Sequence, residues 1–476
     1  MRPRLLLARF GSGRRPGAPG GDPVEGALIV SRSGDNGNAG TLASPWRTLA
    51  YALTQASAGD TIYLRDGYYD VVGTDVYLSP LTKSGTSGDP ITISSYPGER
   101  AIFDGINHSW HPRYFGDGNS PTAPMLLDLR GEHLVIEHLE FRNSVGHNVF
   151  ITSRNSTFRH LVSRNAHATN FYAAMQDCEI HDNIFLDGHS VVNAGISGNG
   201  MVLNNSPTLD TTWPGAVATN NHIHRVVGHF NSDDAFNIIG THCRNNVIEH
   251  CLATGNGVGG GNGTGYKIGL FQQDNTENTY RYCASVNDKN GWNTNADEGN
   301  LIHNCLTVGA ETTGFLLRWN TAEPDSNRCN NTAYNNVSTG SGSFARIVGE
   351  TGCIAALTTH THNAGAPIGW GDGSNGSNNK SWTVEQLALV STDIESADFG
   401  KLSGGSLALG AGITVNVAAD QDLGPVPAGE SFGRGWDWRT LMSTHPSVRM
   451  NHFDATGGPG GVPIQYPMPQ NTYEFT

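Results

Sequence analysis

The feature that most constrains the fold of this 476-residue chain is an internal repeat that begins near residue 134. The segments VIEHLEFRNS, TFRHLVSRNA and EIHDNIFLDG begin 22 residues apart, and VIEHCLATGN, TYRYCASVND and LIHNCLTVGA repeat the pattern further along. Short β-type segments separated by Gly and Asn turns at this period are typical of a solenoid. Leucine-rich repeats have a similar period but need a Leu-x-x-Leu-x-Leu pattern, which is absent here. The repeat therefore predicts an all-β parallel β-helix.

Two columns of residues recur once per coil and predict what fills the interior. One column runs through Leu139, Leu161, Asn183, Val226, Cys251, Cys283, Cys305, Cys329 and Cys353. A second, mostly aromatic column runs through Phe171, Met201, Phe236, Tyr266, Trp292, Phe315 and Phe344. Equivalent residues of successive coils stack about 4.8 Å apart, so we expect a buried ladder of thiols and a stack of rings in the core. The 43-residue step from Asn183 to Val226 is expected to contain two coils.

Each of these columns has a functional alternative. A zinc site would need closely spaced cysteine pairs, and the sequence has none. A sugar-binding strip would need the aromatic column to face outward. The turn residues His138, His160 and His250 are interpreted as hydrogen-bonded ladders rather than metal ligands. The total of seven cysteines is odd, which excludes a framework in which every cysteine is paired.

The repeat divides the chain into four segments. Residues 1–26 are expected to form a flexible N-terminal arm, with attachment to a larger assembly as the alternative. Residues 27–130 are expected to form an N-terminal cap with the first coils, and residues 131–356 the β-helix core. Residues 357–476 are expected to form the last coils and an irregular extension, which is a second candidate for attachment to an assembly.

Local patterns add a few elements to this outline. Residues 45–57 place apolar side chains at helical spacing and predict a short capping helix, with Pro45 in its first turn. Residues 59–69 predict a strand, a turn and a strand, and residues 89–98 predict another strand. The segment SWTVEQLAL predicts a short helix capped at Ser381 or Thr383.

Composition limits the partners and the location of the protein. The formal net charge is −14, which argues against nucleic acid as a partner. No apolar run reaches the roughly 18 residues that a membrane-spanning helix needs, so no membrane partner is expected. The apolar patch near the N-terminus is shorter than the roughly 7–15 residues of a signal-peptide core. We therefore expect an extracellular or virion-associated protein that lacks a standard signal peptide.

The segment FNSDDAFNI places two adjacent carboxylates, Asp233 and Asp234, inside an apolar run. Two adjacent like charges are unfavourable unless water or a cation screens them. Asn237 and Lys267 each follow an aromatic-column residue by one position. The alignment therefore predicts that they are neighbours on the outward face, one coil apart.

A carboxylate pair beside a lysine suits β-elimination from a uronate polysaccharide. Ca²⁺ takes hard oxygen ligands and would lie on the aspartates, and Lys267 would remove the proton as the base. Arg318 and Arg346, expected two and four column steps from Phe236, are candidate oxyanion stabilisers or substrate clamps. Two alternatives remain open: the pair is a solvated turn, or it serves glycoside hydrolysis with both carboxylates facing outward.

Four segments carry a resemblance to a known family. SPWRTLAYALTQASAGDTIYLRDGYY, SGTSGDPITISSYPGERAIFDG, NSDDAFNI and GTGYKIG together resemble the family 9 polysaccharide lyases, which are pectate-lyase-like right-handed parallel β-helices. The resemblance extends over roughly residues 29–340. It implies that Lys267 is the Brønsted base and that Asp233 and Asp234 ligate Ca²⁺. This chain has Asn237 and Asn199 where the family pattern implies two further aspartates, so amide oxygens take the place of two carboxylates.

Two functions of different classes follow from these features. The first is a polysaccharide lyase that uses a lysine base and Ca²⁺ on an acidic, uronate-containing polysaccharide. The second is a structural or carbohydrate-binding β-helix, a spike or fibre of a phage tail or surface assembly, with or without depolymerase activity. Retention of Lys267 and the aspartate pair favours the first. The basic N-terminal arm, the replaced acidic positions and the C-terminal extension favour the second.

Overall fold

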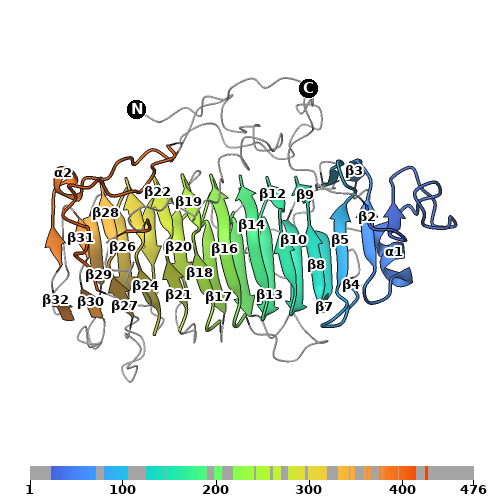
Figure 1. Ribbon diagram of the computed structural model, residues 1–476, viewed down its shortest axis with the longest axis horizontal. Coiled ribbons are helices and arrows are strands. Elements are labelled where there is room, and N and C mark those ends of the chain that lie inside the picture. The colour runs from blue at the N-terminus through green and yellow to red at the C-terminus, as the bar shows by residue number, and fades with distance from the viewer. Residues whose placement is uncertain are drawn as a thin grey trace.

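The computed structural model describes the following residues: 23–70, 80–105, 125–144, 146–189, 198–205, 218–240, 243–257, 261–269, 277–294, 299–318, 331–341, 343–348, 359–361, 363–365, 375–377, 379–394, 396–413 and 424–426. Within them the chain is a right-handed parallel β-helix whose coils follow one another along one long axis (Figure 1). The all-β fold class expected from the repeat is confirmed.

One wall of the β-helix is a ten-stranded parallel sheet. Its strands are β4 (Leu81–Thr82), β7 (Met125–Glu132), β10 (His147–Arg154), β13 (Phe171–Gln176), β15 (Met201–Asn205), β17 (Phe236–Gly240), β20 (Thr264–Ile268), β23 (Asn290–Asn293), β26 (Thr313–Arg318) and β29 (Ser343–Val348).

The other walls belong to a 23-stranded sheet, to which most coils contribute two short strands or one long bent strand. Its strands are β1 (Leu28–Val30), β2 (Thr61–Leu64), β3 (Gly67–Asp70), β5 (Ile91–Ser95), β6 (Ala101–Asp104), β8 (Leu134–Glu137), β9 (Leu139–Arg142), β11 (Thr157–Arg159), β12 (Val162–Arg164), β14 (Glu179–Leu186), β16 (His222–His229), β18 (Val247–Glu249), β19 (Leu252–Thr254), β21 (Thr279–Arg281), β22 (Ala284–Val286), β24 (Leu301–His303), β25 (Leu306–Val308), β27 (Thr332–Tyr334), β28 (Val337–Thr339), β30 (Thr359–Thr361), β31 (Ala364–Gly365), β32 (Asn375–Ser377) and β33 (Lys380–Ser381).

Left-handed residues turn the chain between the strands of each coil. One corner column has φ between 51° and 56° at His138, His160, Asp182, Arg225, His250, Tyr282, Asn304 and Asn335. Residues other than glycine seldom adopt this conformation, and Asn, Asp and His adopt it most readily. The histidines expected as turn ladders lie in this column, where the ring of His138 stacks on that of His160 with centroids 4.6 Å apart. Together these corners keep the strands of successive coils in register.

An asparagine ladder runs inside the β-helix at another corner. In each successive pair, the Oδ1 atom of the later asparagine accepts hydrogen bonds of 2.9–3.1 Å from the backbone N–H and the side-chain amide of the earlier one. Its members are Asn221, Asn246, Asn278, Asn300 and Asn331. The ladder satisfies buried backbone donors that the turn leaves unpaired.

The aromatic column is confirmed as core packing. Phe236, Tyr266, Trp292 and Phe315 are buried and stack on one another, with ring centroids 4.6–4.9 Å apart. The column therefore does not form an outward sugar-binding strip. The expectation for Phe344 is wrong, because Phe315 has Ala345 as its Cα partner on the next coil.

The thiol ladder is confirmed over three coils and wrong beyond them. Cys251, Cys283 and Cys305 are buried and free, one coil apart. Burial raises the pKa of the Cys251 and Cys305 thiols well above the usual value, which keeps them unreactive. On the next coil, Asn336 occupies the position next to Cys305. The backbone N–H of Cys305 donates to Asn336 Oδ1 at 2.9 Å. An amide oxygen accepts such a hydrogen bond better than a thiol does. The two other residues expected in the ladder, Cys329 and Cys353, lie outside the described residues.

A long insertion, not an extra coil, separates Asn183 from Val226. These residues are direct Cα partners on β14 and β16, so the expected two-coil step is wrong. Parallel pairing depends on the strand sequences and leaves the length of the connecting loop free. The correction brings the start of β14 directly beside the start of β16.

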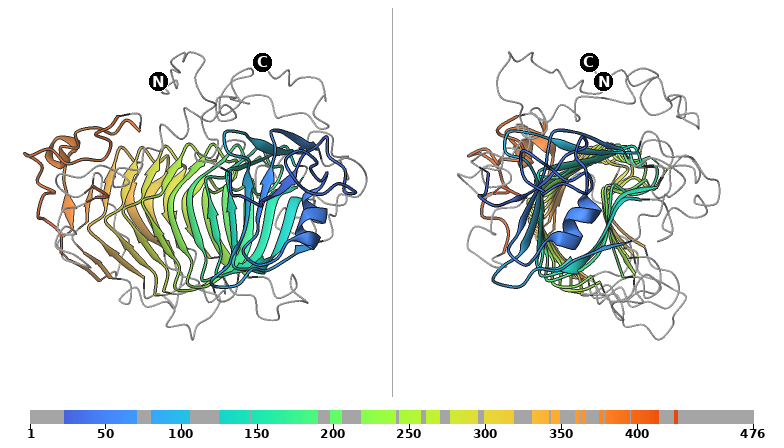
Figure 2. Two further views of the ribbon diagram at one scale, coloured as in Figure 1. Left: turned by 45° about the vertical axis from the view of Figure 1, so that its right-hand side comes forward. Right: turned by 90° about the vertical axis from the view of Figure 1, so that its right-hand side faces the viewer.

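Two short helices occur where the sequence predicts them. Helix α1 (Leu49–Gln55) lies across the N-terminal end of the β-helix and buries Leu49, Ala52 and Leu53 there (Figure 2). It begins after Thr48, whose side chain accepts from Tyr51 N–H, so Pro45 precedes the helix and is not in its first turn. Helix α2 (Val384–Leu387) begins with a capping box at Thr383.

The segment around α2 folds back on the outer face of the larger sheet. Its side chains Leu387, Phe399 and Val426 pack against outward-facing apolar residues of the last coils, among them Leu306 and Val337. The C-terminal extension is therefore partly a cover for the solenoid. The arm expected at residues 1–26 lies outside the described residues up to residue 22.

Candidate functional site

The two aspartates lie in the turn that leads into β17, and both are buried. The Oδ1 atom of Asp233 accepts from Asn262 N–H at 2.8 Å, and the Oδ1 atom of Asp234 accepts from Thr264 N–H at 3.0 Å. The backbone N–H of Asp234 donates to Asn199 Oδ1 at 3.1 Å. Three successive coils therefore hold the pair, and the solvated-turn interpretation is wrong.

Lys267 lies beside this pair in the register that the sequence predicts. Asn237 and Lys267 are Cα partners on β17 and β20. The Nζ atom of Lys267 is 3.1 Å from Asp234 Oδ2, and the Asn237 side-chain amide donates to the same oxygen at 3.2 Å. The exposed fraction is 0% for Asp234 and 5% for Lys267. The lysine and the carboxylate thus form a buried ion pair.

The four expected cation ligands are neighbours in the fold, since Asn199 and Asn237 hydrogen-bond to Asp234 and Asp233 precedes it. Ca²⁺ prefers carboxylate and amide oxygens as ligands. These are the ligand atoms that Asp233, Asp234, Asn237 and Asn199 offer. Among the described residues, the buried Oδ1 atom of Asn237 has no hydrogen-bond partner. A buried acceptor left in this way is costly, and a cation would satisfy it.

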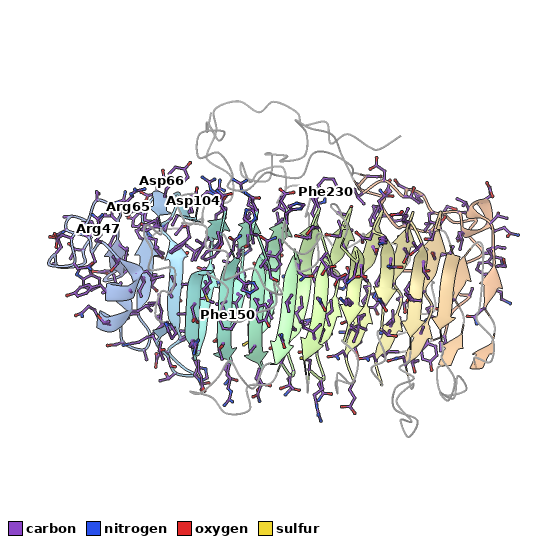
Figure 3. All side chains as sticks on the ribbon, turned by 180° about the vertical axis from the view of Figure 1, so that it is seen from behind. Arg47, Arg65, Asp66, Asp104, Phe150 and Phe230 are labelled. Carbon is purple, nitrogen blue, oxygen red and sulfur yellow. The ribbon has the colours of Figure 1, made fainter. Side chains whose placement is uncertain are left out.

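The outward row of the ten-stranded sheet changes from apolar to polar between Val202 and Asn237. Moving toward the N-terminus from Asn237, the row continues through Val202, Tyr172 and Phe150, all buried. Phe150 is on β10, toward the N-terminal end of this wall (Figure 3). The row is therefore apolar and buried from Phe150 to Val202 and polar at Asn237, Lys267 and Asn293. On the other side of the apolar stretch, Phe150 has Asp128 as its Cα partner. The sequence patterns did not reveal this change along the row.

The two candidate arginines lie further along the same wall. Arg346 is the Cα partner of Leu316, which follows Asn293 and Lys267 in the outward row. Arg318 is on β26, three coils after Phe236 and not two as expected, because Tyr266 and Trp292 each occupy one coil between them. The structure describes the backbone of both arginines only, and their role in holding substrate stays a prediction.

Within the described part of the chain, no helix has the length and apolar character needed to cross a membrane.

Comparison with known proteins agrees with the β-helix architecture. A family model described as "Pel9A-like, right handed beta helix region" matches residues 28–347, which is well over half of the chain. The chain belongs to the Pel9A-like right-handed β-helix family. The resemblance that the four sequence segments carry is thereby confirmed, over nearly the range that they indicated.

Individual relatives of this Pel9A-like chain match parts of it. Pectate lyase PEL9 of Emericella nidulans is 41% identical over 78 residues, which are 16% of this chain and 18% of that protein. The protein YwoF of Bacillus subtilis is also 41% identical over 78 residues, 16% of this chain and 15% of its own. The match therefore spans less than a fifth of either relative.

Solved structures share the fold of this Pel9A-like chain over most of its length. The crystal structure of pectate lyase Pel9A superposes with a TM-score of 0.62 at 17% identity, covering 84% of this chain and 96% of that one. A rhamnogalacturonan lyase superposes with a TM-score of 0.56 at 19% identity, covering 79% and 96%. At these identities the likeness establishes the β-helix architecture, and the chemistry has to be argued from the site itself.

Proposed function

We propose that this protein is a polysaccharide lyase that cleaves an acidic, uronate-containing polysaccharide by β-elimination. The observation that carries the proposal is the buried contact between Lys267 and Asp234, with the unsatisfied Asn237 oxygen beside it. The carboxylate fixes the position of this buried lysine, which can act as a base once it has lost its proton. The names of the pectate lyase relatives point to the same class of reaction.

The proposed step is a single elimination. The Nζ atom of Lys267 takes the proton from the carbon next to the substrate carboxylate. The electrons of that C–H bond form a C=C bond, the glycosidic C–O bond breaks, and the leaving oxygen takes up a proton. No water is consumed, so the product is an unsaturated sugar rather than a hydrolysed one.

The proposed metal is Ca²⁺, held by Asp233, Asp234, Asn237 and Asn199. When bound, it would neutralise the substrate carboxylate and so acidify the adjacent C–H bond. The Lys267 ammonium already lies against Asp234. Only a Lys267 that has given up its proton can accept one from the substrate, so the base must leave this ion pair during the cycle.

The test is an absorbance assay for the new C=C bond. Polygalacturonate and a panel of other uronate polymers are incubated with the protein, with Ca²⁺ or with EDTA. We expect a Ca²⁺-dependent rise for at least one polymer, lost in Lys267→Ala and kept in Lys289→Ala, a half-buried lysine outside the site. A flat signal for every polymer, or a Lys267→Ala variant as active as the wild type, would overturn the proposal.

The replacement of two acidic positions by Asn237 and Asn199 favours a second candidate, a β-helix that binds the polymer without cleaving it. Such a protein would serve in an extracellular or virion-associated assembly. Co-sedimentation with an acidic polymer in the absence of any absorbance rise distinguishes it from the lyase.

A further inference from the structure

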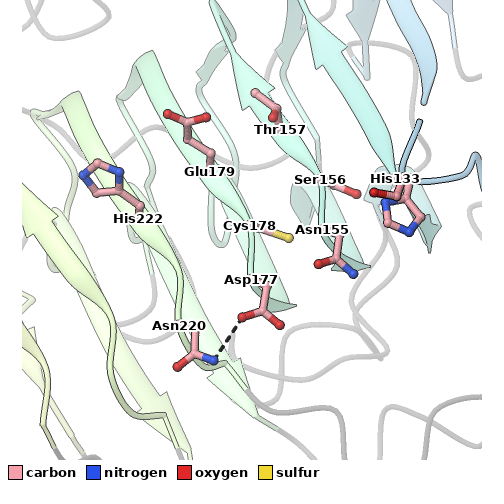
Figure 4. A pocket seen from close by; sticks show the side chains of 10 residues that line it. His133, Asn155, Ser156, Thr157, Asp177, Cys178, Glu179, Asn220 and His222 are labelled. Carbon is pink, nitrogen blue, oxygen red and sulfur yellow. Dashed lines mark hydrogen bonds between the residues drawn. The ribbon is translucent and has the colours of Figure 1, made fainter. Parts of the chain in front are cut away.

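A second polar cluster lies on the outer face of the larger sheet, away from the ten-stranded wall. Glu179 opens β14 and His222 opens β16, and the two are Cα partners. His224 lies two residues after His222 and therefore points to the same face of the strand. Glu179 and His222 stand on neighbouring strands and line one groove (Figure 4).

The three side chains converge. One ligand atom from each of Glu179, His222 and His224 lies within 4.8 Å of the others. The Oε1 atom of Glu179 is 2.9 Å from His224 Nε2, and the Nε2 atom of His222 is 2.9 Å from Oε1 of Glu249. Glu249 is in turn held by Arg281 Nε at 2.5 Å. A second carboxylate is thus fixed next to the cluster.

We propose that Glu179, His222 and His224 bind one borderline divalent transition-metal ion of the zinc class. Two imidazoles and one carboxylate form a donor set that such ions prefer over Ca²⁺, which takes oxygen ligands. Ligand atoms lie about 2.0–2.2 Å from such an ion, so the side chains need only small rotations to reach it. The ion joins β14 to β16 across the long insertion that separates them in sequence.

Solvent reaches the cluster through the groove. The groove has a volume of about 650 Å³, and its lining includes His133, Asn155 and Asp177 as well as Glu179 and His222. The side chains of Glu179 and His222 are 48% and 43% exposed, whereas that of His224 is 9% exposed. An ion held here keeps at least one coordination position open to water or to an oxygen ligand in the groove, as three-ligand sites do.

A competing interpretation is an ordinary lattice of surface ion pairs. Arg159 and Glu137 form such a pair on the same face, with Arg159 Nη2 at 2.7 Å from the carboxylate. A lattice of this kind joins donors and acceptors two at a time and gives no preference for a metal. Convergence of three donors is what distinguishes the Glu179 cluster.

Zn²⁺ titration of the full chain tests the proposal. The protein is treated with EDTA, dialysed, and titrated with Zn²⁺ by calorimetry and by competition with a chromophoric chelator. We expect one ion per chain at this cluster. His224→Gln and Glu179→Gln should each weaken binding by about 10–100-fold or more, the scale at which even indirect supporting residues act.

A matched control is available in the same groove. His133 lines the groove but lies outside the cluster, and its φ of 54° is one that asparagine tolerates. His133→Asn should therefore leave Zn²⁺ binding unchanged. Lys267→Ala should also leave it unchanged, because that residue is on the other sheet, so the outcome is independent of the proposed lyase function.

Two results would overturn the proposal. One is the absence of binding at millimolar Zn²⁺. The other is equal affinity of the wild type, His224→Gln and Glu179→Gln, which would place the ion elsewhere. Circular dichroism and thermal unfolding of each variant without metal show whether a lost signal reflects a lost ligand or a lost fold.

Discussion

The β-helix carries two polar clusters that come from the same repeat and differ in burial. The side chains of Asp234 and Lys267 are 0% and 6% exposed, whereas those of Glu179 and His222 are 48% and 43% exposed. In both clusters the partners are placed by one-coil register between parallel strands. The register determines which side chains contact one another, and burial determines how much each contact contributes to stability.

The difference follows from the cost of removing a charge from water. When one partner of a buried pair is deleted, the other is left as an uncompensated charge, at a cost of about 3–5 kcal/mol. An exposed pair is screened by solvent and contributes about 0–1 kcal/mol. The buried cluster is therefore suited to hold a reacting group in place, and the exposed one to exchange its ligands with solvent.

The variant with the largest expected effect on the buried cluster is Lys267→Ala. We expect lyase activity to fall by about 10²–10⁴-fold, the range for loss of a general base. The free energy of unfolding without Ca²⁺ should fall by about 3–5 kcal/mol, because Asp234 stays buried without its partner. The absorbance assay and urea unfolding measure the two effects.

The control for this variant is the double change Lys267→Met with Asp234→Asn. It removes both charges, so it should recover most of the stability and none of the activity. If Lys267→Ala lowers the free energy of unfolding no more than Lys289→Ala at a half-buried position does, the contact with Asp234 does not stabilise the fold as a buried pair should.

A second test adds a charge to the buried cluster through Asn237→Asp. The unsatisfied Asn237 oxygen becomes part of a carboxylate, so Ca²⁺ affinity should rise by about tenfold, which equals about 1.4 kcal/mol. Without Ca²⁺ the added charge lies near Asp234 and should lower the melting temperature. Calorimetry and thermal unfolding with and without Ca²⁺ measure both.

The control for the added charge is Asn293→Asp. Asn293 is the Cα partner of Lys267 in the same outward row, but it lies on the far side from the aspartates. Its change should raise Ca²⁺ affinity less than Asn237→Asp does. Equal gains would indicate a general field effect instead of ligation by residue 237.

A third test concerns a buried carboxylate whose described partners are uncharged. Asp288 accepts from the Asn256 backbone and side chain at 2.8 Å and from Ser285 Oγ at 2.6 Å. Burial raises its pKa to about 7, above the value of about 3.9 in an unfolded chain. The unfolded chain thus loses this proton first, and stability falls as pH rises from about 4 to about 7.

Asp288→Asn should remove that loss. Asparagine can keep the bonds to Asn256 and Ser285, so we expect little change near pH 4 and a gain of about 1–3 kcal/mol at pH 8. Urea unfolding at both pH values measures the difference. A variant that is destabilised equally at both would show that the charge itself is needed.

The smallest expected effect is the loss of an exposed ion pair, that of Arg159 and Glu137. Arg159→Ala deletes one partner of a pair in which the arginine side chain is 40% exposed. The loss should be below about 1 kcal/mol and should shrink at high salt. A loss as large as that of Lys267→Ala would contradict the assignment of stability to burial.

Much of the fold was predictable because a solenoid converts linear spacing into contact. Aligning Phe236 with Tyr266 was enough to place Asn237 beside Lys267, since alternation and one-coil stacking leave a single solution. The depth of the site was not predictable, because strand alternation places a side chain on one face of a sheet without saying how deeply it is buried. Lys267 was expected on an outward, polar row and is only 5% exposed.

The failures have physical causes of their own. The sequence put Cys329 above Cys305 because thiols recurred at a similar step, but the turn needed an acceptor for a backbone N–H and Asn336 supplies it. The Glu179 cluster was missed because a 43-residue step was divided into two coils. The His-x-His spacing at residues 222–224 was the available signal, since it places two imidazoles on one face of a strand.

The contacts of the aspartate pair come from three successive coils, those of β15, β17 and β20. Each coil of a solenoid interacts only with its neighbours, so its stability is nearly a sum of local terms. A coil added or removed near β5 to β9, away from these three coils and from Arg318 and Arg346, would change the length of the molecule and leave the aspartate pair untouched. If the proposed lyase function holds, the length of polymer that the protein contacts and the reaction at one sugar could therefore change independently.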